Sequence, residues 1–300
     1  MVRAPGVTQW FPLPYGEFGS ALRDPLDFHL KARERFGDVF RFRIGPILLH
    51  CLYHPDHVRH VLYDHGTNYL RGWHYRLLLR LFGPNMVASE SPSWLRQRRL
   101  AQPAFHRQRL DGYANVMVDA TSQLVSRWQD SARSGELVNV VPEMLRLALA
   151  VASRTLFDRD ISDEAANIGK AFAVVRQYLE SRFNYSLTSA PSWMPTPTNR
   201  RFKSAMRELN ELVLKLIQDR RREGRDHGDL LSMLLQARDE ETGDSMSDSQ
   251  LRTQALTFLM AGHETTATAL NWTWYLLGTH ASIRQQVREE PNVHSQRRPR

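Results

Sequence analysis

TFLMAGHETTATALNW, residues Thr257–Trp272, lies in the middle of the longest apolar helical pattern of the chain. A glycine in a helix interior costs about 1 kcal/mol relative to alanine, and a buried carboxylate is expensive without a partner. Gly262 and Glu264 both break these local preferences, as residues at functional sites are expected to do. The stretch therefore predicts a helix that carries a site as well as a core face.

The start of this helix is marked in the sequence. Ser247 and Gln250 have the Ser-x-x-Gln spacing of a capping box, in which each side chain satisfies a backbone N–H of the first turn. The helical pattern continues from Asp248 to about His280, which predicts a length of roughly 45–50 Å. A helix of that length crosses a whole domain, so we expect it at the centre of a large, mainly α-helical fold.

Mostly small side chains recur in this helix at the spacing that places residues on one face. The stripe consists of Phe258, Ala261, Gly262, Thr265, Thr268 and Ala269. The hydroxyl of Thr265 lies one turn after Ala261 and can hydrogen-bond the carbonyl of that residue. With Glu264 at its edge, the stripe suits proton delivery to a group bound against the helix. Close packing of a second helix is the alternative interpretation.

The region before this helix is predicted to be mainly helical, with one small sheet. Phe40 and Phe42 alternate with arginines, which is typical of a strand with one buried face. A Gly-Pro turn and a second strand over 47–53 follow. A helix is expected over 25–36, and a break in helical structure is expected around Pro103. Further helices are predicted over 114–132, 142–157, 165–182, 199–223 and 229–238.

Composition narrows the class of protein. The 300 residues are 42% hydrophobic and 24% charged, an ordinary globular composition. The net charge of +8 indicates a basic surface, which is either simply solvated or suited to an acidic partner. The N-terminus lacks the apolar run of a signal peptide or membrane anchor. With a single cysteine, Cys51, neither an internal disulfide nor a cysteine-based zinc site can form, so we expect a soluble, cytoplasmic protein.

AGHETT, residues Ala261–Thr266, resembles the oxygen-activating helix of the cytochrome P-450 superfamily, the haem-thiolate monooxygenases. The resemblance implies haem b as the cofactor, with Ala261 and Gly262 leaving room for dioxygen over the iron. It also implies that Thr265 hydrogen-bonds the iron-bound peroxide and that Glu264 helps to relay protons. Glu264 and Thr265 are therefore the candidate catalytic residues.

A second motif, WLRQR, matches the Trp-x-x-x-Arg of the same family. Trp94 and Arg98 are four residues apart and share one helix face, and the resemblance implies that they hold a haem propionate. It also implies that the preceding loop lines a substrate pocket, with Val87 as the candidate contact. The expected substrate is an apolar small molecule, and the expected electron donor is a ferredoxin, a flavodoxin or a reductase.

The resemblance covers about 23–290. We predict a P-450-like domain over this range, after a Pro/Gly-rich segment at 1–22 and before a polar tail at 291–300. The helical pattern of the sequence is lost in this tail, which suggests a shift of reading frame. The family's axial cysteine lies in a glycine-containing loop after the oxygen-activating helix. Cys51 precedes that helix and is interpreted as a small buried side chain, so no iron ligand is assigned.

The resemblance therefore implies a mainly α-helical fold with a small N-terminal β-sheet, an incomplete P-450 fold that is truncated before the cysteine loop. Such a chain is expected to expose a large apolar surface and to be inactive alone. A non-catalytic truncated remnant or helical binding protein is the alternative function.

Three further patterns in the sequence are compatible with other functions. HETTA begins like the zinc motif His-Glu-x-x-His, but Ala267 replaces the second histidine and excludes it. A histidine run either lies on the surface or binds a metal; it comprises His50, His54, His57 and His60. A basic cluster is either solvated or docks an acidic electron-transfer partner; it comprises Arg96, Arg98, Arg99, Arg107 and Arg109. No nucleic-acid motif accompanies the cluster.

Overall fold

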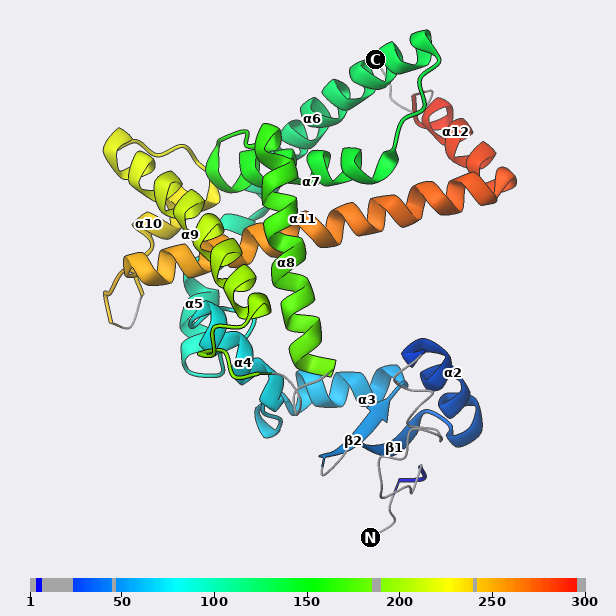
Figure 1. Cartoon of the computed structure of the whole chain (residues 1–300). Helices are drawn as coiled ribbons and strands as arrows, with labels where there is room; N and C mark the ends of the chain where they lie inside the picture. Colours follow the sequence, from blue (N-terminus) through cyan, green and yellow to red (C-terminus); the bar gives the residue numbers. More distant parts are fainter. Residues whose placement is uncertain (1–3, 7–23, 45–46, 185–189, 240–241, 296–300) are drawn as a thin grey trace. The chain divides into compact units, whose positions relative to one another are not determined.

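The computed structural model describes residues 4–6, 24–44, 47–184, 190–239 and 242–295 (Figure 1). The chain divides into two compact units, Met1–Arg71 and Gly72–Arg300. The Pro/Gly-rich segment predicted at 1–22 and the end of the polar tail predicted at 291–300 lie almost entirely outside the described residues.

The first unit contains a short helix packed on a two-stranded sheet. Helix α2 (Pro25–Phe36) contacts strand β1 (Val39–Ile44), which pairs antiparallel with β2 (Ile47–Leu52). Phe40 and Phe42 are buried, so the alternation of the first strand correctly predicted its inner face. These elements are followed by helix α3 (Pro55–Arg59), a π-helical turn (His60–Asp64) and a 3-10 turn (Gly66–Asn68).

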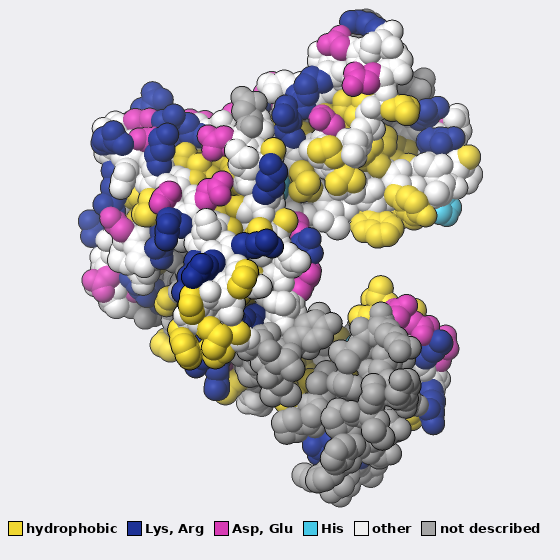
Figure 2. Space-filling view, viewed as in Figure 1, with side chains coloured by type: hydrophobic (Ala, Val, Ile, Leu, Met, Phe, Trp, Pro, Cys, Tyr) yellow, Lys and Arg dark blue, Asp and Glu magenta, His cyan; other side chains and the backbone are white. Residues whose placement is uncertain are grey.

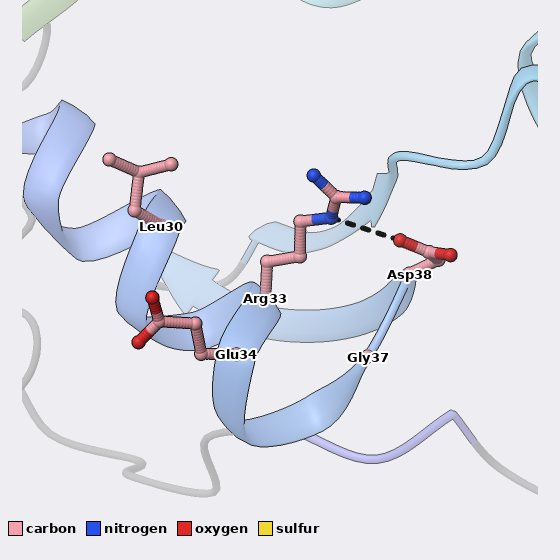
Figure 3. A pocket seen from close by; sticks show the side chains of 5 residues that line it. All are labelled: Leu30, Arg33, Glu34, Gly37 and Asp38. Carbon is pink, nitrogen blue, oxygen red and sulfur yellow. Dashed lines mark hydrogen bonds and ion pairs between the residues drawn. The ribbon is translucent and has the colours of Figure 1, made fainter.

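A shallow polar hollow lies where α2 ends (Figure 3). The Nε of Arg33 lies 3.0 Å from Oδ1 of Asp38 across this hollow, and Gly37 between them has a φ of +84°. A positive φ favours glycine, because other residues clash with their own backbone there. The ion pair and the glycine end the helix and direct the chain into β1.

The second unit is mainly helical in its described residues. Its α-helices are α4 (Trp73–Phe82), α5 (Ser93–Ala101), α6 (Arg107–Ser134), α7 (Val140–Phe157), α8 (Ala165–Asn184), α9 (Pro197–Glu223), α10 (Leu230–Gln236), α11 (Asp248–Thr279) and α12 (Ala281–Ser295). Two 3-10 turns, Gln102–Phe105 and Ser162–Glu164, connect neighbouring helices. A mainly helical fold with a small N-terminal sheet is thus confirmed.

Helix α11 is the long helix that the sequence predicted, and it runs through the second unit (Figure 1). Both hydrogen bonds of its capping box are present: Ser247 Oγ accepts from the Gln250 amide, and Gln250 Oε1 accepts from the Ser247 amide. The helix packs on α7, α9 and α10. Its N-terminal half supplies fully buried core residues such as Leu251 and Leu259, so this half anchors the unit.

Several helix boundaries differ from those predicted. Helix α5 stops where expected, since Pro103 lies in the 3-10 turn that follows it. Helix α6 begins at Arg107 rather than at residue 114, and α4 was not predicted. Helix α12 continues to Ser295, although the sequence pattern predicted that helical structure ends after Glu290.

The described residues contain neither a membrane-spanning helix nor a metal-binding cluster of three or more side chains. No helix there combines the length and the apolarity that crossing a bilayer requires. No group of three or more His, Cys, Asp or Glu side chains there is arranged to hold a metal ion. The histidines of the run are all exposed: His50, His54, His57 and His60.

Candidate functional site

The middle of α11 lines an open groove of about 490 Å³. The residues that line it are Met260, Glu264, Thr265, Thr268, Ala269 and Trp272. Three members of the predicted stripe therefore face this groove. Their short side chains leave the helix backbone accessible to a flat ligand.

The remaining members of the stripe lie elsewhere on the helix. A Cβ atom built on Gly262 would lie 3.7 Å from Cβ of Ala152 in α7, an ordinary van der Waals distance, so this glycine faces a neighbouring helix. Phe258 lies against Phe105, with 5.8 Å between the ring centroids. Ala261 is exposed. The stripe thus combines the two interpretations that the sequence left open, helix packing on one edge and a ligand-sized groove on the other.

Thr265 makes the hydrogen bond that its position predicted. Its hydroxyl donates to the backbone carbonyl of Ala261, while the side chain remains exposed in the groove. This bond competes with the helix's own hydrogen bond to the same carbonyl and loosens the helix at that turn. A threonine hydroxyl rotates freely, so it can also donate to a ligand in the groove.

Glu264 is held by a partner from another helix. Its Oε1 lies 2.8 Å from Nε of Arg176 in α8, and Arg176 also pairs with Glu180 at 2.8 Å. The Glu264 side chain is 39% exposed, so its carboxylate is in contact with both the groove and solvent. This placement suits a group that exchanges protons between water and the groove.

His263, the neighbour of this glutamate, is buried and unpaired. It is 1% exposed and its ring centroid lies 5.4 Å from that of Phe172 in α8. Neither ring nitrogen forms a hydrogen bond with a described group. Burial lowers the pKa of the imidazole below its ordinary value, and the nearby Leu145 backbone opposes this shift in part. The side chain is therefore neutral at pH 7.

The second predicted motif lies on α5. The guanidinium of Arg98 is stacked over the ring of Trp94, with 5.1 Å between its Cζ and the ring centroid. No acidic side chain of the described residues pairs with Arg98, which is exposed. An exposed arginine beside an indole offers a planar set of donors that suits a carboxylate.

A buried pair of glutamines fixes α5 against α11. Nε2 of Gln254 donates to Oε1 of Gln97 at 2.5 Å, and both side chains are buried. Gln254 precedes Ala261 by two helical turns, which corresponds to about 10 Å along the axis. Trp94 lies about one turn before Gln97 and Arg98 directly follows it, so both are held close to the helix that carries the groove.

The loop that contains Val87 is tied to the same pair. The Met86 amide donates to Oε1 of Gln254 at 3.4 Å. Oδ1 of Asn85 accepts from the amides of Val87 and Ala88 at 3.0 Å each. Val87 is 46% exposed, and its contact with substrate stays a prediction.

Three of the five arginines of the predicted basic cluster have partners inside the unit. Arg96 and Arg99 lie 3.8 and 3.5 Å from Oδ2 of the buried Asp239. Arg109 donates to the carbonyl of Gly228 at 3.2 Å. These three arginines therefore stabilise the unit itself. The cluster has correspondingly fewer cations available to bind an acidic partner.

Cys51 lies in β2 of the first unit. Its Sγ is 3.9 Å from Nδ1 of His29, which also meets the Tyr53 hydroxyl at 2.7 Å. The thiol is partly buried, and burial raises its pKa. It is therefore protonated at pH 7, as expected for a structural side chain and not for a metal ligand.

The donor set fits one side of a haem group. Small groove-lining side chains, a hydroxyl and a carboxylate are present on α11, and an unpaired cation is present on α5. The fit does not extend to an axial thiolate, because the single thiol, Cys51, is partly buried in β2 and burial raises its pKa.

The site includes residues that sequence reasoning missed. Arg176, Gln97 and Gln254 contact their partners across long stretches of sequence, and the two glutamines are 157 residues apart. No local spacing could have linked them. His263 was visible as a polar residue in an apolar helix, but nothing in the sequence predicted that both of its nitrogens are unpaired.

Residues 7–300 match the cytochrome P450 family. The chain is 35% identical over 272 residues to the cyclooctat-9-en-7-ol 5-monooxygenase of Streptomyces melanosporofaciens, covering 89% of this chain and 57% of that protein. It is 33% identical to the pentalenene oxygenase of Streptomyces avermitilis, covering 92% and 60%. The crystal structure of the cytochrome P450DA heme domain matches with a TM-score of 0.76 at 29% identity, over 94% of this chain and 62% of that one. The chain thus spans less than two thirds of the length of these relatives.

Proposed function

Because the chain belongs to the cytochrome P450 family, we propose that its second unit forms the oxygen side of a haem pocket in a monooxygenase. The observation that carries this proposal is the exposed Thr265 hydroxyl, bonded to the Ala261 carbonyl in a groove with Glu264 at its edge. A bound haem supplies the iron chemistry that activates dioxygen. The residues of this chain bind and orient the group and deliver protons to it.

Two residues of α5 are proposed to hold the haem. The guanidinium of Arg98 pairs with a propionate, and the indole N–H of Trp94 donates a second hydrogen bond. The stack between the two side chains limits the rotamers of Arg98, so less side-chain entropy is lost when the propionate binds.

Proton delivery is proposed to run from solvent through Glu264 to Thr265. The carboxylate exchanges protons with water because it is partly exposed, and Arg176 keeps it on the groove side of α11. Thr265 gives its proton into the groove and regains one from the glutamate directly or through water. After Thr265 gives up its proton and before it regains one, its position is maintained by the local contact with the Ala261 carbonyl.

The substrate is proposed to be an apolar, mainly hydrocarbon molecule. The names of the two Streptomyces relatives denote oxygenases that act on pentalenene and on cyclooctat-9-en-7-ol, both of which contain a carbon–carbon double bond. The groove includes Met260, Ala269 and Trp272, which offer an apolar wall. Val87 is proposed as a further contact, and a ferredoxin, flavodoxin or reductase as the electron donor.

The test uses a hybrid in which this chain is followed by the part of the Streptomyces melanosporofaciens relative that it does not match. Thr265→Ala should bind substrate as before, while electrons from the donor are diverted to hydrogen peroxide. We expect product formed per electron pair to fall at least roughly ten-fold, because a positioned proton donor typically contributes about 10²–10⁴-fold to the rate. The measurements are substrate binding, product and peroxide in parallel.

Thr273→Ala is the matched control, because Thr273 makes the same local bond to the Ala269 carbonyl, at 2.9 Å. It should leave the yield unchanged. Equal yields in the Thr265 and Thr273 variants would reduce the groove hydroxyl to a packing role and remove the basis of the proposal.

A further inference from the structure

Two histidines that follow α3 in the first unit lie against each other, and they are called the histidine pair below. The ring centroids of His60 and His65 are 4.4 Å apart, with 45° between the ring planes. Both side chains are exposed, and neither ring nitrogen forms a hydrogen bond or an ion pair with a described group. The nitrogens of both rings are therefore available to bind a third atom.

The histidine pair is produced by the π-helical turn His60–Asp64. The His65 amide donates to the His60 carbonyl at 2.9 Å. In a regular α-helix, two residues five apart would point about 140° away from each other around the axis. The wider turn joins residues i and i+5 and places their side chains on one side. Turns of this kind are rare, and they occur frequently at functional sites.

The backbone on both sides holds the two residues in place. The His60 amide donates to carbonyls of α3. The His65 carbonyl accepts from the Asn68 amide at 2.9 Å. The ring of His60 also meets the ring of Tyr69 edge to face, with 6.3 Å between the centroids. Little backbone freedom therefore remains to be lost when a ligand joins the two rings.

The charged residues of this turn compensate one another. Nε of Arg59 lies 3.3 Å from Oδ1 of Asp64. The same guanidinium lies over the ring of Tyr63, with 5.9 Å between its Cζ and the ring centroid. The positive charge of Arg59 is thus offset within the turn, so it opposes a cation bound at the histidine pair only weakly.

We propose that the histidine pair binds a Cu²⁺ ion through one nitrogen of each ring. Imidazole is a good ligand for copper, nickel and zinc. Two rings that bind one ion at right angles, with metal–nitrogen distances of about 2.1 Å, have centroids about 4.5 Å apart, whereas a tetrahedral ion separates them by about 5.2 Å. The observed 4.4 Å fits the right-angled arrangement. That arrangement is preferred by Cu²⁺, while Zn²⁺ prefers the tetrahedral one.

Two protein ligands make this an open site. The described residues hold no group of three or more ligating side chains, and a closed structural site uses four. Water fills the remaining positions around the ion, which should therefore exchange readily with a chelator. The proposal is independent of the proposed haem chemistry, because both histidines belong to the first unit.

A second pair of histidines in this region is less suited to a metal. The ring centroids of His54 and His57 lie 5.4 Å apart. Nδ1 of His54 accepts from the Asp56 amide at 3.3 Å and caps α3. A neutral ring whose Nδ1 accepts a hydrogen bond carries its proton on Nε2 and has no lone pair left for an ion. His57 is therefore a matched control residue.

The experiment titrates the whole 300-residue chain, prepared without a polyhistidine tag, with CuCl₂. Calorimetry measures the affinity, and electron paramagnetic resonance reports the nitrogen ligands of the ion. We expect one tightly bound ion per chain, with hyperfine splitting from two imidazoles. His60→Gln and His65→Gln should each weaken binding at least about ten-fold, because the second ring binds at a high effective concentration once the first is attached. Each variant should also lose one nitrogen from the spectrum.

His57→Gln should keep both the affinity and the two-nitrogen spectrum of the parent chain, and circular dichroism checks that every variant is folded. A folded parent chain that binds no Cu²⁺ more tightly than the double variant of His60 and His65 would overturn the proposal. A loss in His57→Gln as large as in His65→Gln would assign the ion to the wider histidine run instead. Displacement of Cu²⁺ by an equal concentration of Zn²⁺ would contradict the right-angled geometry.

Discussion

Three consecutive side chains of α11 lie in three different environments. His263 is buried without a hydrogen-bond partner, Glu264 is half-exposed in an ion pair, and Thr265 faces the groove. Successive residues on a helix are 100° apart, so neighbours in sequence can point to the core, to an adjacent helix and to a ligand. The polar residues of this stretch therefore serve different purposes, and only the last two are available for chemistry.

The buried imidazole should make the stability of the chain depend on pH. Its pKa is lowered in the folded state, so the unfolded chain binds a proton more readily. The stabilising effect of the neutral ring is thus complete above the unfolded pKa of about 6.5 and is lost as the pH falls below it. Between pH 7 and 5.5 the loss from His263 should be at most about 1.3 kcal/mol.

His263→Phe tests this expectation by chemical denaturation at both pH values. Phenylalanine keeps the contact with Phe172 and removes the two unpaired nitrogens, so the variant should be less sensitive to acid than the parent. His280→Phe, at the exposed end of α11, is the control and should retain the parent's pH dependence. An unchanged pH dependence in His263→Phe would show that the ring is already protonated or paired in the folded state.

For individual residues, the sequence correctly predicted contacts between neighbours within one helix. The bond from Thr265 to Ala261 follows from a spacing of four residues in a helix, so its geometry is implied once the helix is accepted. The pairing of Glu264 with Arg176 depends on how α8 crosses α11, and no residue pattern encodes that crossing. The roles of these residues toward haem rest on resemblance and stay predictions.

At the scale of elements, α5, the loop after α4 and α11 form one connected assembly. Thr253 donates to the carbonyl of Phe82 at 3.2 Å, and the buried pair Gln97–Gln254 joins the two helices. Nε2 of Gln97 also donates to Ser93 at 3.0 Å. The polar groups satisfy one another in the interior, so removing one member leaves others unpaired.

Replacing one of these glutamines with an apolar residue of similar size should therefore still lower the free energy of unfolding, because its partner is left unpaired. Gln97→Leu leaves the amide of Gln254 buried without its partner, and we expect a loss of about 1–3 kcal/mol in the free energy of unfolding. The double variant with Gln254→Leu should lose less than the sum of the two single variants, because the orphaned partner is removed as well. Gln177→Leu, at an exposed position of α8, should change stability by no more than about 0.5 kcal/mol. Strict additivity would contradict the buried pair.

The start of α11 was located from its side-chain cap, whereas two helices without such a cap were misplaced or missed. Ser247 caps α11 and marks its first residue, whereas α4 begins after Gly72 and α6 after His106, neither of which provides a capping side chain. Without that signal, the start of α6 was placed seven residues too late and α4 was not predicted. Packing in the unit sets these boundaries instead.

At the scale of the whole molecule, the two halves of α11 have different surroundings. The N-terminal half is core, while its C-terminal half exposes Trp272 to 61% and Tyr275 to 60%. Hydrophobic side chains gather over this end in Figure 2. The expected exposed apolar surface is therefore present, on the same helix as the candidate site.

We expect that haem bound by the 300-residue chain alone has no thiolate ligand, because Cys51 is the only thiol. Cys51 is protonated and lies beside His29 in a sheet, so it should supply no thiolate to iron. After reconstitution with haem, reduction and addition of carbon monoxide, the red-shifted band characteristic of thiolate ligation should be absent. The hybrid chain described above is the positive control. A thiolate band in the 300-residue chain that disappears in Cys51→Ser would contradict this assignment.

The packing of α7 against α11 also has a consequence for synthesis on the ribosome. Leu149 of α7 is fully buried, and α11 is a principal partner of α7. About 90 residues separate the end of α7 from the start of α11. At a translation rate of about 5–20 residues per second, α7 waits on the order of 5–20 s before its partner is made. During that interval its apolar face is a substrate for chaperones, and slower translation of the intervening segment lengthens the exposure.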